Sequence, residues 1–185
     1  MKKQIILSFL LCIGTTVSLL AQGVANDTLL FVYKLHGQTR KYQTTFTEKQ
    51  DTLYLHWGIE RNLKWQSGSY AMKRKSVEQA IRLSFLQPED GKHVLLSPEE
   101  TVSMLSLAAY KQLKERNSFL YNQTNYSMLD SEEKALGLPL IHVKDAIEGC
   151  EMWILDNPCF PLIWRMHSNP VGINWEVSVY RHTSL

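Results

Sequence analysis

Short runs of alternating apolar and polar residues fill most of the chain after residue 27. In the run 51–57, for example, Leu53, Leu55 and Trp57 alternate with Tyr54 and His56. A period of two, interrupted by Gly, Asn or Asp, is typical of β-strands with one buried face. The pattern predicts strands over residues 28–35, 40–47, 51–57, 63–73, 81–86, 92–96, 118–126, 138–143, 149–155, 160–166 and 173–180.

One segment between these runs has the signals of a helix. Ser97 can cap free backbone amides, Pro98 suits a first helical turn, and Glu100 can complete a capping box. We therefore expect a helix over residues 97–116. The predicted helix has a main apolar stripe, and three further apolar side chains lie well off that stripe: Met104, Leu107 and Ala108. A helix apolar on more than one side is either covered by a second layer of its own domain or lines a ligand cavity.

The order of elements is strands, one helix, then strands again. Consecutive strands with short connections form antiparallel sheets, and a sheet of many strands twists and tends to curl. The predicted fold class is α+β, mostly antiparallel β. We expect a strongly curved sheet, or incomplete barrel, wrapped around one main helix.

The first residues have the order of a secretory leader. Two lysines follow Met1, an apolar stretch runs from residue 5 to residue 20, and small residues allow cleavage after Ala21 or Ala25. Residues 1–21 are therefore predicted to be a signal peptide, and residues 22–185 a single β-rich domain. The terse basic start is typical of bacteria. We expect an exported protein, periplasmic or extracellular in a Gram-negative bacterium.

The charge and hydropathy of the chain after the leader argue against nucleic-acid binding and against a membrane-spanning helix. Cleavage removes two lysines, so 20 Lys and Arg become 18 against 18 Asp and Glu, and the formal net charge falls from +2 to about zero. Nucleic-acid binding needs clustered Lys and Arg on one face. The one basic cluster, Lys73-Arg74-Lys75, is only three residues long and is interpreted as a solvated strand end or loop. No later apolar segment reaches the roughly 20 residues of a membrane-spanning helix.

Two cysteines, Cys150 and Cys159, remain after cleavage. If residues 149–155 and 160–166 form a hairpin, four to five strand residues separate the thiols, or roughly 13–16 Å. A disulfide needs Cα atoms about 4.4–6.8 Å apart. The hairpin therefore favours free thiols, and a Cys150–Cys159 bridge stays possible only if the turn is a wide loop.

Sequence motifs for catalysis, metal binding or nucleotide binding are absent, and the six histidines are scattered. We predict no catalytic residue, no metal site and no cofactor. The tryptophans are more informative because all five fall on predicted strands: Trp57, Trp65, Trp153, Trp164 and Trp175. They either fill the core or form a concave aromatic face for an apolar or sugar-like ligand.

Three segments carry a resemblance to a known group: residues 87–94 (QPEDGKHV), 152–163 (MWILDNPCFPLI) and 169–175 (NPVGINW). They resemble a group of uncharacterised exported proteins of Gram-negative gut bacteria, over roughly residues 81–177. That group is distantly similar to the periplasmic lipoprotein carriers, which implies a half-barrel closed over by helix. Cys159 stands where the group has an acidic or polar residue, so a disulfide is not implied. The group has no established reaction, and no catalytic residue is carried over.

These observations predict a non-enzymatic periplasmic binding or carrier module for an apolar or acyl-bearing ligand. The candidate binding residues are Met104, Leu107, Trp57, Trp65, Trp153, Trp164 and Trp175. One alternative is an envelope structural or assembly protein, which has a fully packed core and a protein partner. The other is a carbohydrate-binding module that uses exposed tryptophans.

Overall fold

The computed structural model describes residues 27–180. The predicted leader, residues 1–21, and both cleavage positions lie outside this part of the chain. Strands account for 55% of the structure and helices for 10%, so the prediction of a mostly antiparallel β fold is confirmed.

The described elements are two helices and fourteen strands. Their bounds are β1 (Leu29–Leu35), β2 (Gln38–Lys49), β3 (Thr52–Arg61), β4 (Lys64–Lys73), α1 (Arg74–Gln79), β5 (Arg82–Leu83), β6 (His93–Leu95), β7 (Glu100–Thr101), α2 (Leu107–Arg116), β8 (Ser118–Tyr121), β9 (Thr124–Leu129), β10 (Lys134–Ala135), β11 (Leu138–Asp145), β12 (Glu151–Leu155), β13 (Ile163–His167) and β14 (Ile173–Val179).

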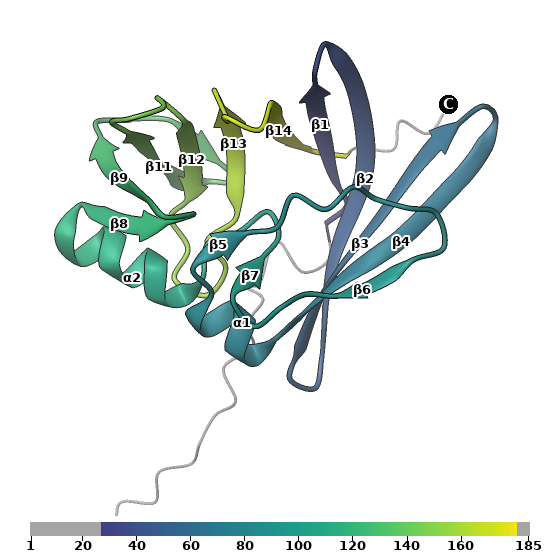
Figure 1. The fold of residues 1–185 in the computed structure, drawn as a ribbon, viewed down its shortest axis with the longest axis horizontal. Coiled ribbons are helices and arrows are strands. Elements are labelled where there is room, and N and C mark those ends of the chain that lie inside the picture. The colour runs from purple at the N-terminus through teal and green to yellow at the C-terminus, as the bar shows by residue number, and fades with distance from the viewer. Residues whose placement is uncertain (1–26, 181–185) are drawn as a thin grey trace, which may run out of the picture.

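One large sheet organises the molecule, in the order β6-β4-β3-β2-β1-β14-β13-β12-β11-β9-β8, with β10 paired to β11. Its neighbours are antiparallel except for the parallel β4–β6 pair. The first and last strands are neighbours, from Leu29↔Val179 to Leu35↔Ile173. Two local meanders are thus joined by the two ends of the described chain (Figure 1).

Strand β2 takes part in two hairpins that diverge. Its first half pairs with β1 up to Leu29↔Thr44, and its second half pairs with β3 from Gln43↔Gly58 onward. The β1–β2 and β3–β4 hairpins therefore splay apart beyond this point (Figure 1). Tyr42 and Trp57 pack edge to face there, with ring centroids 5.9 Å apart.

Four two-residue turns hold consecutive residues in the left-handed conformation: His36-Gly37, Asn62-Leu63, Asn122-Gln123 and Leu136-Gly137. Turns of this kind match the right-handed twist of the strands they join, and Asn and Gly are favoured in them. The Asn122-Gln123 turn divides the predicted strand 118–126 into β8 and β9. The sequence did not indicate this turn, because its second residue is not the glycine that such turns favour.

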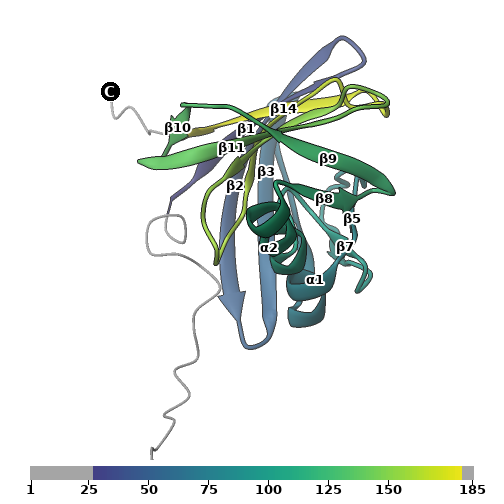
Figure 2. The same ribbon diagram turned by 90° about the vertical axis from the view of Figure 1, so that its left-hand side faces the viewer.

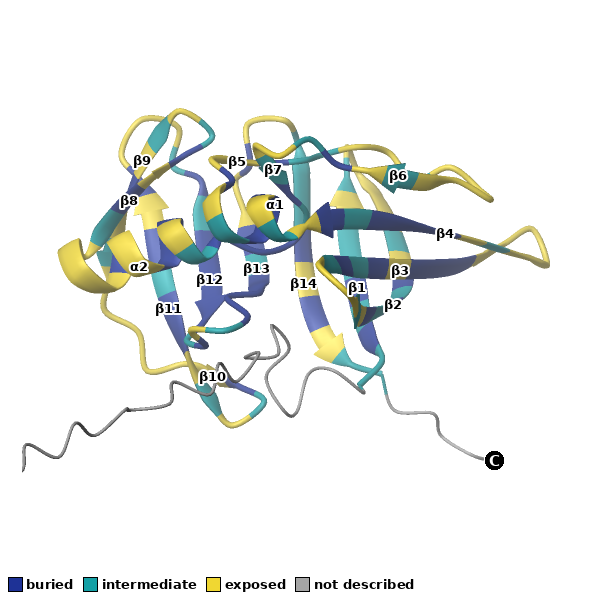
Figure 3. Cartoon of the chain, turned by 90° about the horizontal axis from the view of Figure 1, so that it is seen from below, coloured by how far each residue is buried: buried dark blue, intermediate teal, exposed yellow. Residues whose placement is uncertain are grey.

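Both helices and the β5–β7 pair lie on one face of the sheet, in the angle between the strands of the two halves (Figure 2). The core on this inner face combines side chains from both halves. Phe46 of β2 packs edge to face on Phe160 of the β12–β13 connection, with centroids 4.9 Å apart, and both are fully buried. Figure 3 shows the buried segments meeting under α1 and α2, whose outer sides are exposed.

The predicted helix 97–116 begins ten residues too early. Only Leu107–Arg116 is helical, and Ser106 caps it by accepting a hydrogen bond from the amide of Ala109. The preceding segment instead forms a turn after Ser97 and the short strand β7, and Ser103 has a φ of 57°. A left-handed residue at 103 cannot belong to a continuous helix, which explains the error.

The structure adds a second helix to the one main helix that was predicted, and it leaves the strong curvature of the sheet unconfirmed. A second helix, α1, follows β4 directly, where the sequence suggested a solvated strand end. The sheet is not closed or strongly curled, and its order ends at β6 and β8. The half-barrel therefore stays a prediction.

The position of the helix start can be tested with two serines. Ser106 is fully buried, accepts from Ala109 and donates 2.7 Å to the carbonyl of Ala80. Ser106→Ala should lower the free energy of unfolding by about 1–3 kcal/mol, because it removes a cap and leaves a buried carbonyl unpaired. Ser97→Ala, which removes the cap expected from the sequence, should change it by less than about 0.5 kcal/mol. Urea denaturation of both variants measures the difference, and equal losses would contradict the assignment.

Candidate functional site

Two cavities open on either side of the connection that follows β5. One, the aromatic lobe, has a volume of about 360 Å³ and the other, the aliphatic lobe, about 400 Å³. Phe85 lines both, so the two lobes are neighbours separated by its side chain. Their sizes fall in the range of small-molecule sites, about 300–1,000 Å³.

The floor of the aromatic lobe is built by three adjacent strands of the sheet. Tyr33 of β1 lies between Tyr42 of β2 and Trp175 of β14, with ring centroids 5.6 and 5.8 Å away. The indole of Trp175 donates a 3.0 Å hydrogen bond to the carbonyl of Ile163. The rings are fixed by the ladder and by each other, which makes this floor a preorganised apolar surface.

The roof of the aromatic lobe is the irregular segment 84–88, with Val102 and Ser103 beside it. The hydroxyl of Tyr70 donates to the carbonyl of Leu86 at 3.0 Å, and the amide of Ser84 donates to Thr101 at 2.7 Å. The roof is thus attached to the large sheet by one side-chain hydrogen bond, and at its start to strand β7 by one backbone hydrogen bond.

The aromatic lobe has neutral hydroxyls inside and cationic or titratable side chains at its mouth. Burial raises the pKa of Tyr33 to about 12, despite an opposing hydrogen bond with Ser103, and burial also raises the pKa of Tyr70. Both phenols are therefore protonated at neutral pH. Arg40 and His36 line the opening, and among residues 27–180 no carboxylate is paired with Arg40, which donates to Gln38 instead. The lobe suits a ligand with an apolar body and an acidic head.

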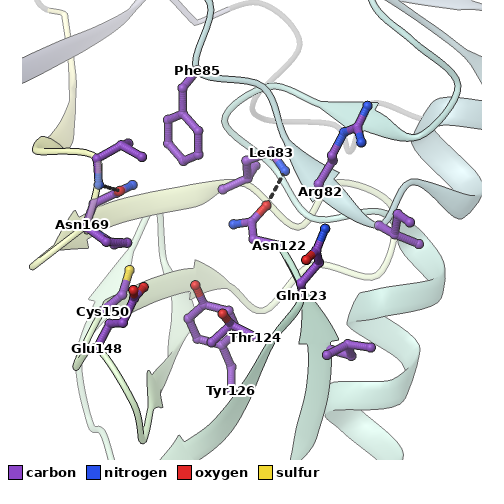
Figure 4. A pocket seen from close by; sticks show the side chains of 14 residues that line it. Arg82, Leu83, Phe85, Asn122, Gln123, Thr124, Tyr126, Glu148, Cys150 and Asn169 are labelled. Atoms are coloured by element: carbon purple, nitrogen blue, oxygen red, sulfur yellow. Dashed lines mark hydrogen bonds between the residues drawn. The ribbon is translucent and has the colours of Figure 1, made fainter.

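The aliphatic lobe lies where the β8–β9 turn is fastened to β5 (Figure 4). The side-chain oxygen of Asn122 accepts a 2.7 Å hydrogen bond from the backbone amide of Leu83, and the backbone amide of Asn122 donates to the carbonyl of Ile81 at 3.0 Å. Half-exposed aliphatic side chains surround the opening: Ile81, Leu120 and Val171. Such a rim leaves apolar surface available to a bound apolar group.

Cys150 lines the aliphatic lobe but is a poor nucleophile. Its side chain is buried, and burial raises the pKa of the thiol to about 11, so the thiolate is scarce at neutral pH. Both Cys150 and Cys159 are free in the structure. The lobe therefore offers Cys150 as an apolar contact.

The candidates chosen from the sequence are scattered. Trp175 lines the aromatic lobe, and Trp57 contacts Tyr42 behind it. Met104 is fully buried and forms a bridge with Leu162, while Leu107 packs against the core, and neither lines a lobe.

The other tryptophans lie away from both lobes. Trp153 stacks on His142 with centroids 4.1 Å apart and has the guanidinium of Arg165 4.8 Å from its ring centre. Trp164 is buried, and Trp65 is 55% exposed at the end of the β3–β4 hairpin. The tryptophans therefore do not form one aromatic face.

Sequence reasoning missed Tyr33, Tyr42, Tyr70 and Arg40. The strand pattern placed all four on predicted strands, but only the tryptophans on those strands were considered as a binding face. No local pattern indicated that segment 84–88 lies over them. The missing information was the contact between the roof and the sheet, which joins distant parts of the chain.

Among the described residues, no group of three or more His, Cys, Asp or Glu side chains is placed to hold a metal ion. Neither helix within residues 27–180 is long and apolar enough to cross a membrane. No protein-family model, curated protein or solved structure matches the chain.

The loop beside the aliphatic lobe depends on one carboxylate. Asp145 is buried and accepts backbone hydrogen bonds of 2.7–2.9 Å from Ile147, Glu148 and Cys150. Burial alone would raise the pKa of Asp145, but these amides outweigh it and lower the pKa below its usual value. A lowered pKa in the folded state stabilises the fold above the unfolded pKa of about 3.9, and this stability is lost as the pH falls below it.

Asp145→Asn should therefore lower the free energy of unfolding at pH 7 by about 1.5–3 kcal/mol, the size of hydrogen bonds to a charged group. The loss should shrink as the pH falls below about 4, because the wild-type carboxylate is then protonated too. Urea denaturation between pH 7 and pH 3 measures both effects. Glu132→Gln, at an exposed carboxylate, is the control. A loss that does not depend on pH would contradict the role of the Asp145 charge.

Proposed function

We propose that this chain is a non-enzymatic binding or carrier module for an amphipathic ligand with an acyl-like apolar body and an acidic head. The observation that carries the proposal is the pair of neighbouring lobes that share Phe85 of segment 84–88. The body lies on the rings of Tyr33 and Trp175, with the head at Arg40. A longer tail passes Phe85 into the aliphatic lobe.

The physical support is the match between each part of the ligand and its surroundings. Ring faces and aliphatic side chains gain stability by covering an apolar body, at about 25 cal/mol per Å² of surface removed from water. Arg40 supplies a permanent positive charge, and the N–H groups of its guanidinium match the two oxygens of a carboxylate. The phenols of Tyr33 and Tyr70 are neutral and therefore do not repel an anion, and that of Tyr70 holds the roof through its hydrogen bond to Leu86.

The proposal also includes the location of the protein, which is the periplasm. Export to the periplasm is supported by residues 1–21, and the likeness to lipoprotein carriers by the three segments described above. The resemblance implies an incomplete β-barrel that is closed over by helix. Segment 84–88 takes the covering role here.

Two alternatives have less support. A structural protein with a fully packed interior leaves the two lobes unexplained. A carbohydrate-binding module needs exposed aromatic platforms, whereas four of the five tryptophans are buried.

Filling each lobe separately tests where the ligand lies. Ser84→Trp places a large ring in the aromatic lobe and should weaken binding of a fluorescent C16 fatty acid at least tenfold, because it occupies the space of the body. Leu120→Trp fills the opening of the aliphatic lobe and should weaken the C16 acid but not a C8 acid, whose tail is too short to reach it. Fluorescence titration measures both affinities.

The matched control is Leu129→Trp, since Leu129 is exposed on β9 and lines neither lobe. Its affinity should equal that of the wild type. If the wild type binds neither acid, or if all three tryptophan variants bind equally well, the proposed function is wrong.

The acidic head can be tested through Arg40. Arg40→Gln should weaken binding of the C16 acid by about tenfold, equivalent to about 1.4 kcal/mol, because a charge-assisted hydrogen bond is lost. The affinity for the matching C16 alcohol should stay within about twofold, since a neutral head gains little from the guanidinium. Lys41→Gln on the same strand is the control, because Lys41 lines neither lobe. Equal losses for acid and alcohol would refute the role of the charge.

A further inference from the structure

The β3–β4 hairpin ends in an exposed apolar tip that extends beyond the rest of the molecule (Figures 1 and 3). Leu63 is 93% exposed, the highest value among the exposed large apolar residues of the described chain. Trp65 is 55% exposed and lies over Gly58, where any larger side chain would collide with the indole ring. The tip, residues 61–65, therefore presents an aliphatic and an aromatic side chain to the solvent.

Two features of this tip oppose the stability of the hairpin. Leu63 has a φ of 59°, a left-handed conformation in which a bulky residue is disfavoured and Gly is preferred. Arg61 and Lys64 face each other as a register pair, and like charges in that position repel. Local choices that work against the fold are characteristic of functional positions.

Charge and shape together indicate the partner. Arg61 and Lys64 flank Leu63, and within residues 27–180 neither makes an ion pair, so both charges are available to an anionic surface. A tip of five residues is too small for the roughly 1,000 Å² of a specific protein interface. A lipid surface, in contrast, accepts one inserted aliphatic side chain with Trp at the head-group level and Lys or Arg beside anionic lipids.

We propose that the β3–β4 tip docks on an anionic lipid bilayer, with Leu63 inserted, Trp65 at the interface, and Arg61 and Lys64 on the head groups. The end of β1 and the start of β2, which line the mouth of the aromatic lobe, lie at the same end of the sheet as this tip, because β1 and β3 are both antiparallel to β2. Docking therefore brings the mouth of the lobe toward the bilayer. The docking surface is separate from the lobes and does not depend on the proposed ligand.

The test uses residues 22–185, because the apolar stretch 5–20 would itself enter a bilayer and the described fold begins after it. Sucrose-loaded vesicles of phosphatidylcholine, alone or with 30% phosphatidylglycerol, are sedimented with the protein. We expect binding to the anionic vesicles that is at least fivefold stronger than to phosphatidylcholine and that weakens with added salt.

Leu63→Gly separates docking from folding. It creates an Asn-Gly turn, so the melting temperature should rise by about 2–4 °C, while binding to anionic vesicles should fall at least fivefold. Ile147→Asn is the matched control, because Ile147 is 85% exposed on a different loop. It should bind vesicles like the wild type. Fatty-acid affinity should stay unchanged in Leu63→Gly, since Leu63 lines neither lobe.

Three results would overturn the proposal. In the first, the wild type does not bind anionic vesicles, which is also the result expected if the partner of the tip is a protein. In the second, Leu63→Gly binds the vesicles as well as the wild type. In the third, Ile147→Asn loses as much binding as Leu63→Gly. None of these results affects the fatty-acid titration, so docking and the proposed function fail independently.

Discussion

The pairing of β1 with β14 is the interaction on which the rest of the structure depends. It joins residues about 150 positions apart, such as Leu29 and Val179, and turns two local meanders into one sheet. Closing so long a loop costs chain entropy that only the completed ladder and the shared core offset. The same ladder places Tyr33 opposite Trp175 and so creates the floor of the aromatic lobe. Folding and the candidate site therefore share one set of contacts.

Floor and roof of that lobe differ in how firmly they are held. The floor consists of adjacent strands with continuous pairing, whereas segment 85–88 makes one hydrogen bond to the sheet among the described residues, from Tyr70 to Leu86. Regions with few buried contacts and few hydrogen bonds open at the lowest free-energy cost. The roof is therefore the part of the site that moves aside most easily, and Phe85 moves with it.

Alternation along the chain was enough to predict the antiparallel sheet, because most of its strands have one buried and one open face. It also placed Tyr33, Tyr42 and Trp175 on strands. It could not predict that β1 and β14 are neighbours, since nothing local distinguishes that pairing from others. Nor could it place the roof. It predicted a strand over residues 81–86, whereas only Arg82–Leu83 form one, and segment 84–88 is irregular and contacts the sheet only through distant residues.

The helix error has a more specific cause. Ser97, Pro98 and Glu100 fit a helix start, and the first helical turn could form locally. Buried hydroxyls from elsewhere stabilise another conformation instead. The hydroxyl of Ser76 lies 2.9 and 2.7 Å from the carbonyl oxygens of Ser97 and Glu100 and shares its one proton between them, and the hydroxyls of Thr101 and Tyr121 form a 2.7 Å hydrogen bond.

These bonds replace those of a helix, and unpairing buried groups costs about 1–3 kcal/mol each, more than a few residues of helix propensity can return. The segment they hold carries Val102 and Ser103 to the wall of the aromatic lobe. The wall of the aromatic lobe thus forms because hydrogen bonds from buried hydroxyl groups are stronger than the local preference for a helix. This is why its shape depends on residues that line neither lobe.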